Sequence, residues 1–439
     1  MLVAHLVVLC AAQIHAQDSL PDLGSGFFSV AYGLNDAGDA VGIAQGQSRN
    51  TLPVLWSQGG IVRLPLLPGD THGTAYGINS AGAVCGLTIG GTLIRAVLWS
   101  GGGIQDLGHL GGGIASATCI NDAGVVAGNS YPAGAGLTHA FRWSPVTGTM
   151  SDLGTLGGAY SAATCLDSAG NAYGVANDAP GAQSAVMWPA GGGTAVMLDS
   201  AGILGFSSIA RGCSESGIVV GDGFDFVLGS RGFTWTAVGG FQLLPHPPGT
   251  LLASAADVND AGQVVVHGRD LRIWLHDLNT GGWLDLGASL PPYPHVSLGA
   301  AYEINNTDQI AGHGFHFATE VSQSAWILSP APDGLGLGEP FPARAGALNS
   351  LGAAGVTPFG TLPVVAGFAA GAAIVPGCGG LTVGIHAPAL LATATADAQG
   401  VVNLTNLFAP PPLASRSVLL QAVELASCRA SNLAVVTFR

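Results

Sequence analysis

The feature that most constrains the fold is a short segment that returns along the whole chain. Its clearest copy is Ala117-Thr-Cys-Ile-Asn-Asp-Ala-Gly-Val-Val-Ala-Gly128, and six further versions of it occur. Aligned on the Asn of Ile-Asn-Asp-Ala-Gly, the copies fall at positions 35, 79, 121, 167, 215, 259 and 305, which are 42 to 48 residues apart. A period in this range is typical of a solenoid, a propeller or an array of modules.

Each repeat unit carries two further landmarks. The first is an apolar run that ends in Trp, and the second is a run of the form Asp-Leu-Gly, as in Ile104-Gln-Asp-Leu-Gly108. The Trp runs account for seven of the eight tryptophans: Trp56, Trp99, Trp143, Trp188, Trp235, Trp274 and Trp326. With the runs on either side of the Asn-Asp-Ala-Gly turn, each unit holds four runs of strand length and no helical periodicity. Because four short strands form one propeller blade, the sequence predicts an all-β, seven-bladed β-propeller with four-stranded blades over residues 17–330.

The two ends of the repeat region indicate how such a ring closes. The last unit supplies three runs, at 301–305, 309–312 and 324–328, but no Asp-Leu-Gly run follows them. A run of that form stands instead ahead of the first unit, as Leu20-Pro-Asp-Leu-Gly24. We therefore expect the N-terminal strand to close the last blade as its outermost strand, which leaves no exposed sheet edge.

The segments outside the repeats have their own character. Residues 1–16 are apolar, end in Ile14-His15-Ala16 and predict a signal peptide, although the segment lacks Arg and Lys; a buried first strand is the alternative. Residues 331–345 are rich in Pro and Gly and predict a linker. Residues 346–439 hold at least six apolar runs of strand length and predict a small C-terminal β-sandwich.

Composition narrows the choice of partners. Only 9% of the 439 residues are charged, all twelve basic residues are Arg, and the formal net charge is −14. Nucleic acids and anionic membranes are bound by clusters of Lys and Arg, so neither is expected as a partner. Because the chain has no Lys, it can neither form a Schiff base through a lysine nor bind a phosphate through a phosphate-loop lysine. No segment predicts a membrane span, and we expect a monomer.

Six cysteines remain after the predicted signal peptide. Cys119, Cys165 and Cys213 stand at the same place in three successive units, two residues before the Asn position, which favours small apolar packing residues, with a disulfide between neighbours as the alternative. Cys378 and Cys428 lie in the C-terminal region, and an exported protein would allow them to form a bridge.

Few residues suggest a site. His72, His109, His246 and His295 fall in connections between repeat units, where solvated loop residues are a simpler interpretation than a metal site. Asp257 and Glu303 stand two residues before the Asn position, and if that strand lines a channel the two acids either bind a cation or face channel water. The Asn-Asp-Ala-Gly turns lack the dense carboxylates of calcium loops, and the Trp runs read as core between blades rather than as sugar platforms. The sequence therefore assigns no catalytic residue, no cofactor and no metal.

The landmarks resemble the HAF-repeat family of secreted bacterial proteins. That family's unit carries segments like His139-Ala-Phe-Arg-Trp143, Asp152-Leu-Gly-Thr-Leu-Gly-Gly158 and Ile120-Asn-Asp-Ala-Gly-Val-Val-Ala-Gly128. Units four to six depart from it: Leu198-Asp-Ser-Ala lacks the Asp-Leu-Gly form, Glu215 replaces Asn, and Val266 replaces the last Gly. The resemblance implies an extracellular protein and no particular reaction. The ending Ser431-Asn-Leu-Ala-Val-Val-Thr-Phe438 also looks like C-terminal modules of secreted planctomycete-type proteins.

Together these features predict a secreted or cell-surface interaction module, not an enzyme, that binds an unknown protein or polysaccharide through one loop face of the propeller. Two alternatives stay open. One is an extracellular propeller-type glycan lyase or hydrolase, for which paired carboxylates would have to converge at the channel. The other is a passive structural protein of the envelope or matrix.

Overall fold

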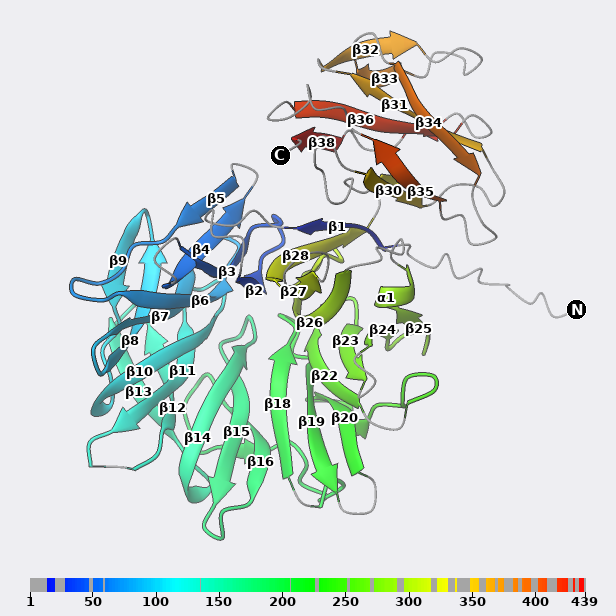
Figure 1. Cartoon of the computed structure of the whole chain (residues 1–439). Coiled ribbons are helices and arrows are strands. Elements are labelled where there is room, and N and C mark those ends of the chain that lie inside the picture. Colours follow the sequence, from blue (N-terminus) through cyan, green and yellow to red (C-terminus); the bar gives the residue numbers. More distant parts are fainter. Residues whose placement is uncertain are drawn as a thin grey trace, which may run out of the picture. The chain divides into compact units, whose positions relative to one another are not determined.

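The computed structural model of the chain is all-β apart from one short helix (Figure 1). It describes residues 14–19, 28–46, 50–57, 60–134, 136–205, 207–225, 229–250, 253–268, 272–289, 296–316 and 322–330, and a set of strands between 336 and 437. The chain divides into two compact parts, one of Ser19–Gly287 with His295–Ile327, and one of Met1–Asp18, Ala288–Pro294 and Leu328–Arg439. Within the described ranges, no helix is long and apolar enough to cross a membrane.

The repeat units form four-stranded antiparallel meanders whose strands follow chain order, and a parallel pairing joins those of the second and third units into one eight-stranded sheet. The first three are β2 (Ser29–Leu34), β3 (Ala40–Gln45), β4 (Thr51–Ser57), β5 (Gly60–Arg63); β6 (His72–Ile78), β7 (Val84–Gly90), β8 (Leu93–Ser100), β9 (Gly103–Asp106); and β10 (Gly111–Ile120), β11 (Val126–Pro132), β12 (His139–Ser144), β13 (Thr149–Gly154). The next are β14 (Gly157–Leu166), β15 (Ala172–Asp178), β16 (Gln183–Trp188), β17 (Val196–Met197); β18 (Ser207–Cys213), β19 (Val219–Asp225), β20 (Gly229–Thr236), β21 (Gly240–Leu243); and β22 (Ala253–Val258), β23 (Gln263–Gly268), β24 (Ile273–Asp277), β25 (Trp283–Asp285), followed by helix α1 (Leu286–Ser289).

The last repeat unit takes its fourth strand from the start of the chain. Its own strands are β26 (Val296–Ile304), β27 (Ile310–His316) and β28 (Ser322–Pro330), and the sheet order is β1-β28-β27-β26 with β1 at Ile14–Ser19. An N-terminal strand at this edge was expected, but the expected run Leu20–Gly24 lies outside the described residues and the strand precedes it. β1 also spans the cleavage position expected after Ala16.

A β-bulge recurs in the first strand of every unit. In β10, the register with β11 shifts between Ala117 and Cys119, so that Thr118 is the extra residue. The partner of Ala117 is Gly128, the last Gly of the repeated segment, and a Cβ there would lie 2.0 Å from the carbonyl oxygen of Ser116. The bulge thus explains why the segment ends in Gly, since only Gly permits this approach of two backbones.

The Asn-Asp-Ala-Gly segment is a structural turn, as predicted. The N–H of Gly124 donates to the carbonyl of Asn121, and the Asn121 side-chain oxygen accepts the N–H of Val125. Gly124 has a φ of 74°, which is the left-handed region that favours Gly. The last unit has Asp308 at this place with a φ of 63°.

The motif tryptophans are core residues, as predicted. Six of them are at most 6% exposed, and Trp235 is half-buried. Each packs among small apolar residues of its own and neighbouring sheets, as Trp143 does with Ala115, Ala117 and Phe141. The core of this part of the chain therefore lies between successive meanders rather than in one central cluster.

The elements that the structure describes after β28, all in the other compact part, are short strands. They are β29 (Gly336–Leu337), β30 (Leu348–Ala354), β31 (Thr361–Gly367), β32 (Ala370–Ile374), β33 (Thr382–Ile385), β34 (Ala389–Thr395), β35 (Val402–Phe408), β36 (Ser417–Glu424), β37 (Arg429–Ala430) and β38 (Ala434–Thr437). They form antiparallel sheets in the orders β29-β30-β35, β34-β31-β36-β37 with β38 also on β36, and β32-β33. β29 lies in the predicted linker, and Cys378 and Cys428 are outside the described residues.

Candidate functional site: the channel between the first strands

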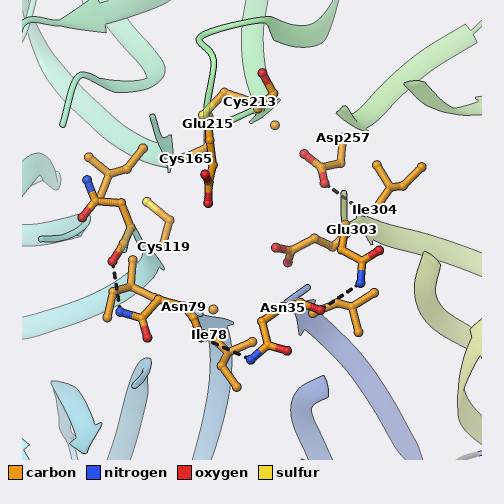
Figure 2. Close-up of a pocket in the computed structure, with 18 of the residues that line it drawn as sticks. Asn35, Ile78, Asn79, Cys119, Cys165, Cys213, Glu215, Asp257, Glu303 and Ile304 are labelled. Carbon is orange, nitrogen blue, oxygen red and sulfur yellow. Dashed lines mark hydrogen bonds between the residues drawn. A yellow bond between two sulfur atoms is a disulfide. The ribbon is translucent and has the colours of Figure 1, made fainter. Parts of the chain in front are cut away.

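The first strand of every repeat unit contributes to one cavity of about 300 Å³. The lining comes from β2, β6, β10, β14, β18, β22 and β26, and in each strand it runs from the bulged residue toward the residue after the Asn position. The first strands therefore stand around a common channel, as propeller topology requires. Figure 2 shows Asn35, Asn79, Glu215 and Glu303 arranged around this space.

Buried asparagines link neighbouring units around the channel. The side-chain amide of Asn35 donates to the carbonyl of Asn79 at 3.2 Å, and Asn79 and Asn121 donate in the same way to the next unit at 3.1 and 3.0 Å. Asn259 donates to Asn305 and Asn305 donates to Asn35, at 3.1 and 2.8 Å. Because the same side chain also holds its own turn, the repeated Asn is a framework residue and not a ligand-binding one.

Units four and five have no amide at this position. Asp167 holds it in unit four, and the structure corrects the register of unit five. The bonds from the N–H of Ser214 to Ile218 and from the N–H of Gly217 to Ser214 match those of Asn121 and Gly124. Ser214, not Glu215, therefore stands at the Asn position, and Glu215 is the residue after it.

A disulfide joins these two units instead. Cys165 on β14 and Cys213 on β18 are bridged, with 5.9 Å between their Cα atoms. The interpretation of both as packing residues is therefore wrong, and the alternative of a bridge between neighbours is confirmed. Since Asp167 has no side-chain amide to donate, the bridge joins units four and five where the Asn bond is missing, beside a 2.8 Å hydrogen bond from the Ser168 hydroxyl to the Glu215 carbonyl.

Two cysteines near the channel are free thiols. Cys85 is buried and Cys119 lines the cavity. Burial raises the pKa of the Cys119 thiol to about 12 and raises that of Cys85 well above its ordinary value. Both stay protonated near neutral pH, so neither is a nucleophile.

The bulged residues face the channel and differ from unit to unit. They are Tyr32, Tyr76, Thr118, Thr164, Arg211, Ala256 and Tyr302. Sequence reasoning missed them, although the signal was present: the third residue before the Asn position varies in chemistry, whereas the residue before it is Ala in every unit.

Three tyrosines form one side of the channel. The ring of Tyr32 lies 5.4 Å from that of Tyr76 and 5.2 Å from that of Tyr302, centroid to centroid, with interplanar angles of 48° and 53°. Burial, reinforced by the other two phenols, raises the pKa of Tyr32 to about 12, so the phenol is neutral. The three rings are inclined to one another and form an aromatic wall.

Asp257 and Glu303 do line the channel, as the sequence suggested. The Asp257 carboxylate accepts the backbone N–H of Ile304 at 2.9 Å, and Glu303 accepts the N–H of Leu34. Burial raises the pKa of Asp257 to about 7, and burial with the nearby Asp257 carboxylate raises the pKa of Glu303 well above its ordinary range. In the described residues, no group of three or more His, Cys, Asp and Glu side chains is placed to hold a metal ion.

Exposed acids surround the mouth of the channel at the turns. Asp36, Asp122, Glu215 and Asp260 stand at the same position, directly after the Asn position. Asp36 and Asp122 each accept a backbone N–H from a neighbouring unit at 2.8 Å, from Asn306 and Ser80. The pKa of Glu215 is raised by partial burial and then by the other three carboxylates, so the four charges act on one another.

The loop histidines that the structure describes belong to no group of side chains placed to hold a metal ion. His72 contacts Thr71, and His109 accepts the N–H of Gly111. The Nδ1 atom of His246 is buried without a hydrogen-bond partner, and His295 lies outside the described residues.

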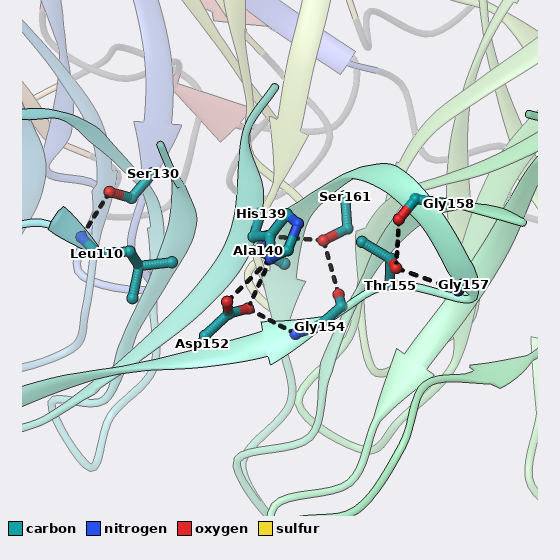
Figure 3. Close-up of polar contacts among 10 residues, drawn as sticks. All are labelled: Leu110, Ser130, His139, Ala140, Asp152, Gly154, Thr155, Gly157, Gly158 and Ser161. Carbon is teal, nitrogen blue, oxygen red and sulfur yellow. Dashed lines mark hydrogen bonds and ion pairs between the residues drawn. The ribbon is translucent and has the colours of Figure 1, made fainter. Parts of the chain in front are cut away.

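The residues that carry the family resemblance are structural. His139 contacts Asp152 at 2.9 Å, and Asp152 accepts the N–H of Gly154 at 2.7 Å (Figure 3). Ser161 accepts the N–H of Ala140 and donates to the carbonyl of Gly154, which fastens unit three to unit four. Ser161 is fully buried and bonds backbone groups rather than His139, so the three side chains do not form a catalytic triad.

The fold and the channel define the chain as a β-propeller-like repeat protein. No protein-family model and no curated protein matches it. Among solved structures, it is similar to virginiamycin B lyase from Staphylococcus aureus, with 14% identity, a TM-score of 0.45 and coverage of 71% of this chain and 98% of that one. It is also similar to YCF48 bound to D1 peptide, with 12% identity, a TM-score of 0.44 and coverage of 73% of this chain and 98% of that one. The similarity to TolB from Acinetobacter baumannii has 14% identity and a TM-score of 0.38. It covers 49% of this chain and 54% of TolB, about half of each.

Proposed function

We propose that the repeat part is a non-catalytic binding module that holds its ligand, a segment of a protein or of a polysaccharide, at the mouth of the channel. The supporting observation is the contrast between framework and lining. The Asn position is kept for inter-unit hydrogen bonds, whereas the bulged position carries Tyr, Thr, Arg or Ala around a cavity of about 300 Å³. Variable side chains on a rigid scaffold are the usual arrangement of a binding site.

This location differs from the propeller face formed by the connections between units. The turns between first and second strands form the mouth with the exposed acids, whereas the connections between units lie at the other ends of the first strands. The varied lining and the charge both favour the turn face.

The experiment is a screen of the full chain against a displayed peptide library and a glycan array, run in parallel with Ala256→Tyr. Three other units carry Tyr at this position, so the framework accepts it, while the larger side chain fills part of the cavity. Ligands that bind the native chain and are lost with Ala256→Tyr support the proposal. If every ligand binds both chains equally, or none binds, the module does not use the channel and the passive structural role is favoured.

A second function, a glycan hydrolase or lyase, is favoured by one observation. Asp257 and Glu303 are two acids in one cavity, both with a raised pKa, and glycosidases use a pair of carboxyl groups of which one stays protonated. If the native chain releases new reducing ends from an array glycan and Glu303→Gln abolishes this release, the enzyme is favoured over the binding module.

The finer architecture and setting are part of the proposal. We propose that the seven units are the blades of one seven-bladed propeller of the HAF-repeat type, closed by the N-terminal strand. The bond from Asn305 to Asn35 and that from the N–H of Ala325 to Ser29 support this closure. The C-terminal strands would form a small β-sandwich, and the protein would be exported, with which the Cys165–Cys213 disulfide agrees.

A further inference from the structure

We propose that the channel binds the ammonium group of a lysine side chain from a partner polypeptide, between the wall of Tyr32, Tyr76 and Tyr302 and the carboxyl group of Glu303. The inference rests on the proposed binding function and names its ligand. It follows from the charge of the lining, from the geometry of the tyrosines and from the carboxyl oxygens that remain free to accept a hydrogen bond.

The charge of the cavity calls for a cation. Five acidic residues line it, and one basic residue does: Asp36, Asp122, Glu215, Asp257 and Glu303, against Arg211. The guanidinium of Arg211 is already paired with Asp222, which also accepts a hydrogen bond from Ser254 at 2.8 Å. At the mouth, the exposed carboxyl groups of Asp36, Asp122 and Glu215 give an excess of negative charge that attracts a ligand with one positive charge. Inside the channel, a bound ammonium would favour the ionised form of Glu303, whose pKa burial raises.

The tyrosines form a wall of tilted aromatic rings. A cation is attracted to the face of an aromatic ring within about 6 Å of its centroid. The 5.2 and 5.4 Å spacings of the rings place a cation at Tyr32 near a second ring as well. Together with the carboxyl group of Glu303, this wall suits an ammonium group.

The carboxyl groups favour lysine over arginine. One oxygen of Asp257 is taken by the N–H of Ile304, and Glu303 is held by the N–H of Leu34. An arginine fork is best bound by both oxygens of one carboxylate, whereas an ammonium is a point charge that one free oxygen satisfies. The lysine must belong to another protein, because this chain contains none.

The test is calorimetric titration of the full chain with the capped peptide Gly-Gly-Lys-Gly-Gly, the same peptide acetylated on the lysine Nε, its Arg counterpart, and a glucosamine tetramer. We expect the lysine peptide to bind at least about tenfold more tightly than the other three. Glu303→Gln keeps an oxygen for the Leu34 N–H and is expected to weaken the lysine peptide by about tenfold or more. The control is Asp106→Asn, which removes one exposed carboxylate from the outer strand β9 and should change nothing.

Each contrary result overturns the inference. If the plain and acetylated peptides bind equally, the site does not recognise an ammonium group. If the Arg peptide binds more tightly, the site does not prefer a point charge. If the glucosamine tetramer binds more tightly, the partner is a polysaccharide. If none binds, yet the screen with Ala256→Tyr still finds channel ligands, the lysine assignment fails and the binding module stands. Circular dichroism of Glu303→Gln separates loss of binding from loss of folding.

Discussion

The side-chain amide of Asn305 donates a 2.8 Å hydrogen bond to the backbone carbonyl of Asn35, 270 residues away in the chain. Both residues are buried at 5% exposure. The bond is the same one that joins consecutive units elsewhere, here made between the last unit and the first. A sequence feature with a local role in a turn therefore also joins the last unit to the first.

We predict that Asn305→Asp lowers the free energy of unfolding by about 1–3 kcal/mol, because Asp still accepts the turn N–H groups but leaves the buried Asn35 carbonyl without its donor. Urea unfolding followed by tryptophan fluorescence measures the loss. The control is Asn50→Asp, since Asn50 donates to the carbonyl of Thr71 in an exposed position and its loss should cost less than about 0.5 kcal/mol. Equal losses in the two variants would show that ring closure does not depend on the Asn305 amide.

Much of the fold was predictable because it repeats. Asn121, Gly124 and Gly128 each have a local physical reason, a turn bond, a left-handed φ or a close backbone approach, and such reasons leave the same residue in most units. The four strands per unit and the buried tryptophans follow from the same periodicity. Unit four shows the limit: where the Asp-Leu-Gly form is lost, β17 shrinks to Val196–Met197 and the carboxylate of Asp199 caps a turn through Ile203 and Leu204 instead.

The channel was harder to predict because its residues are the ones that do not repeat. Asp257 and Glu303 stood out as acids at an apolar position, but Tyr32 and Tyr302 looked like ordinary strand residues. Their meeting depends on ring closure, since they come from opposite ends of the repeat part. The register error at Glu215 had a related cause: without an Asn, neither Ser214 nor Glu215 marks the turn, and only the backbone bonds of Ser214 do.

The disulfide gives a prediction about one interface. Replacing Cys165 and Cys213 together by Ala should lower the free energy of unfolding by about 4 kcal/mol, because the bridge closes a loop of 48 residues in the unfolded chain. Unfolding with and without reductant measures the effect, and the double variant should not respond to reductant. Cys119→Ala serves as the control and should keep the response. A native chain equally stable with and without reductant would contradict a stabilising bridge.

Close backbone approach at the bulge predicts a costly glycine replacement. In Gly128→Ala the new methyl group would meet the Ser116 carbonyl, so the strands must separate, and we expect a loss of about 1–3 kcal/mol in unfolding free energy. Gly103→Ala is the matched control, because the nearest atom to a Cβ there is 3.7 Å away. Thermal unfolding of the two variants checks the difference. The sixth unit has Val266 at this place, so if both variants melt together the other units can adjust as that one does.

The paired acids in the channel predict that the protein loses stability as the pH rises. Asp257 has an ordinary value of 3.8 in the unfolded chain, whereas burial raises its pKa in the folded chain to about 7, and Glu303 beside it is shifted in the same direction. Between these values the folded state binds more protons than the unfolded state, so the free energy of unfolding must fall with rising pH in this window.

We expect the free energy of unfolding in urea to be at least about 1 kcal/mol lower at pH 8 than at pH 5. The reason is that both channel acids must ionise where they are buried, next to each other and to the neutral Cys85 and Cys119 thiols. In Asp257→Asn the side chain cannot ionise, so the stability should depend less on pH. In the double variant with Glu303→Gln, the pH dependence of stability should nearly disappear. Asp106→Asn, on the exposed strand β9, should keep the full dependence of the native chain. If Asp257→Asn and the native chain lose the same stability between the two pH values, the loss arises outside the channel and the carboxyl pair is ionised in the folded protein at little cost.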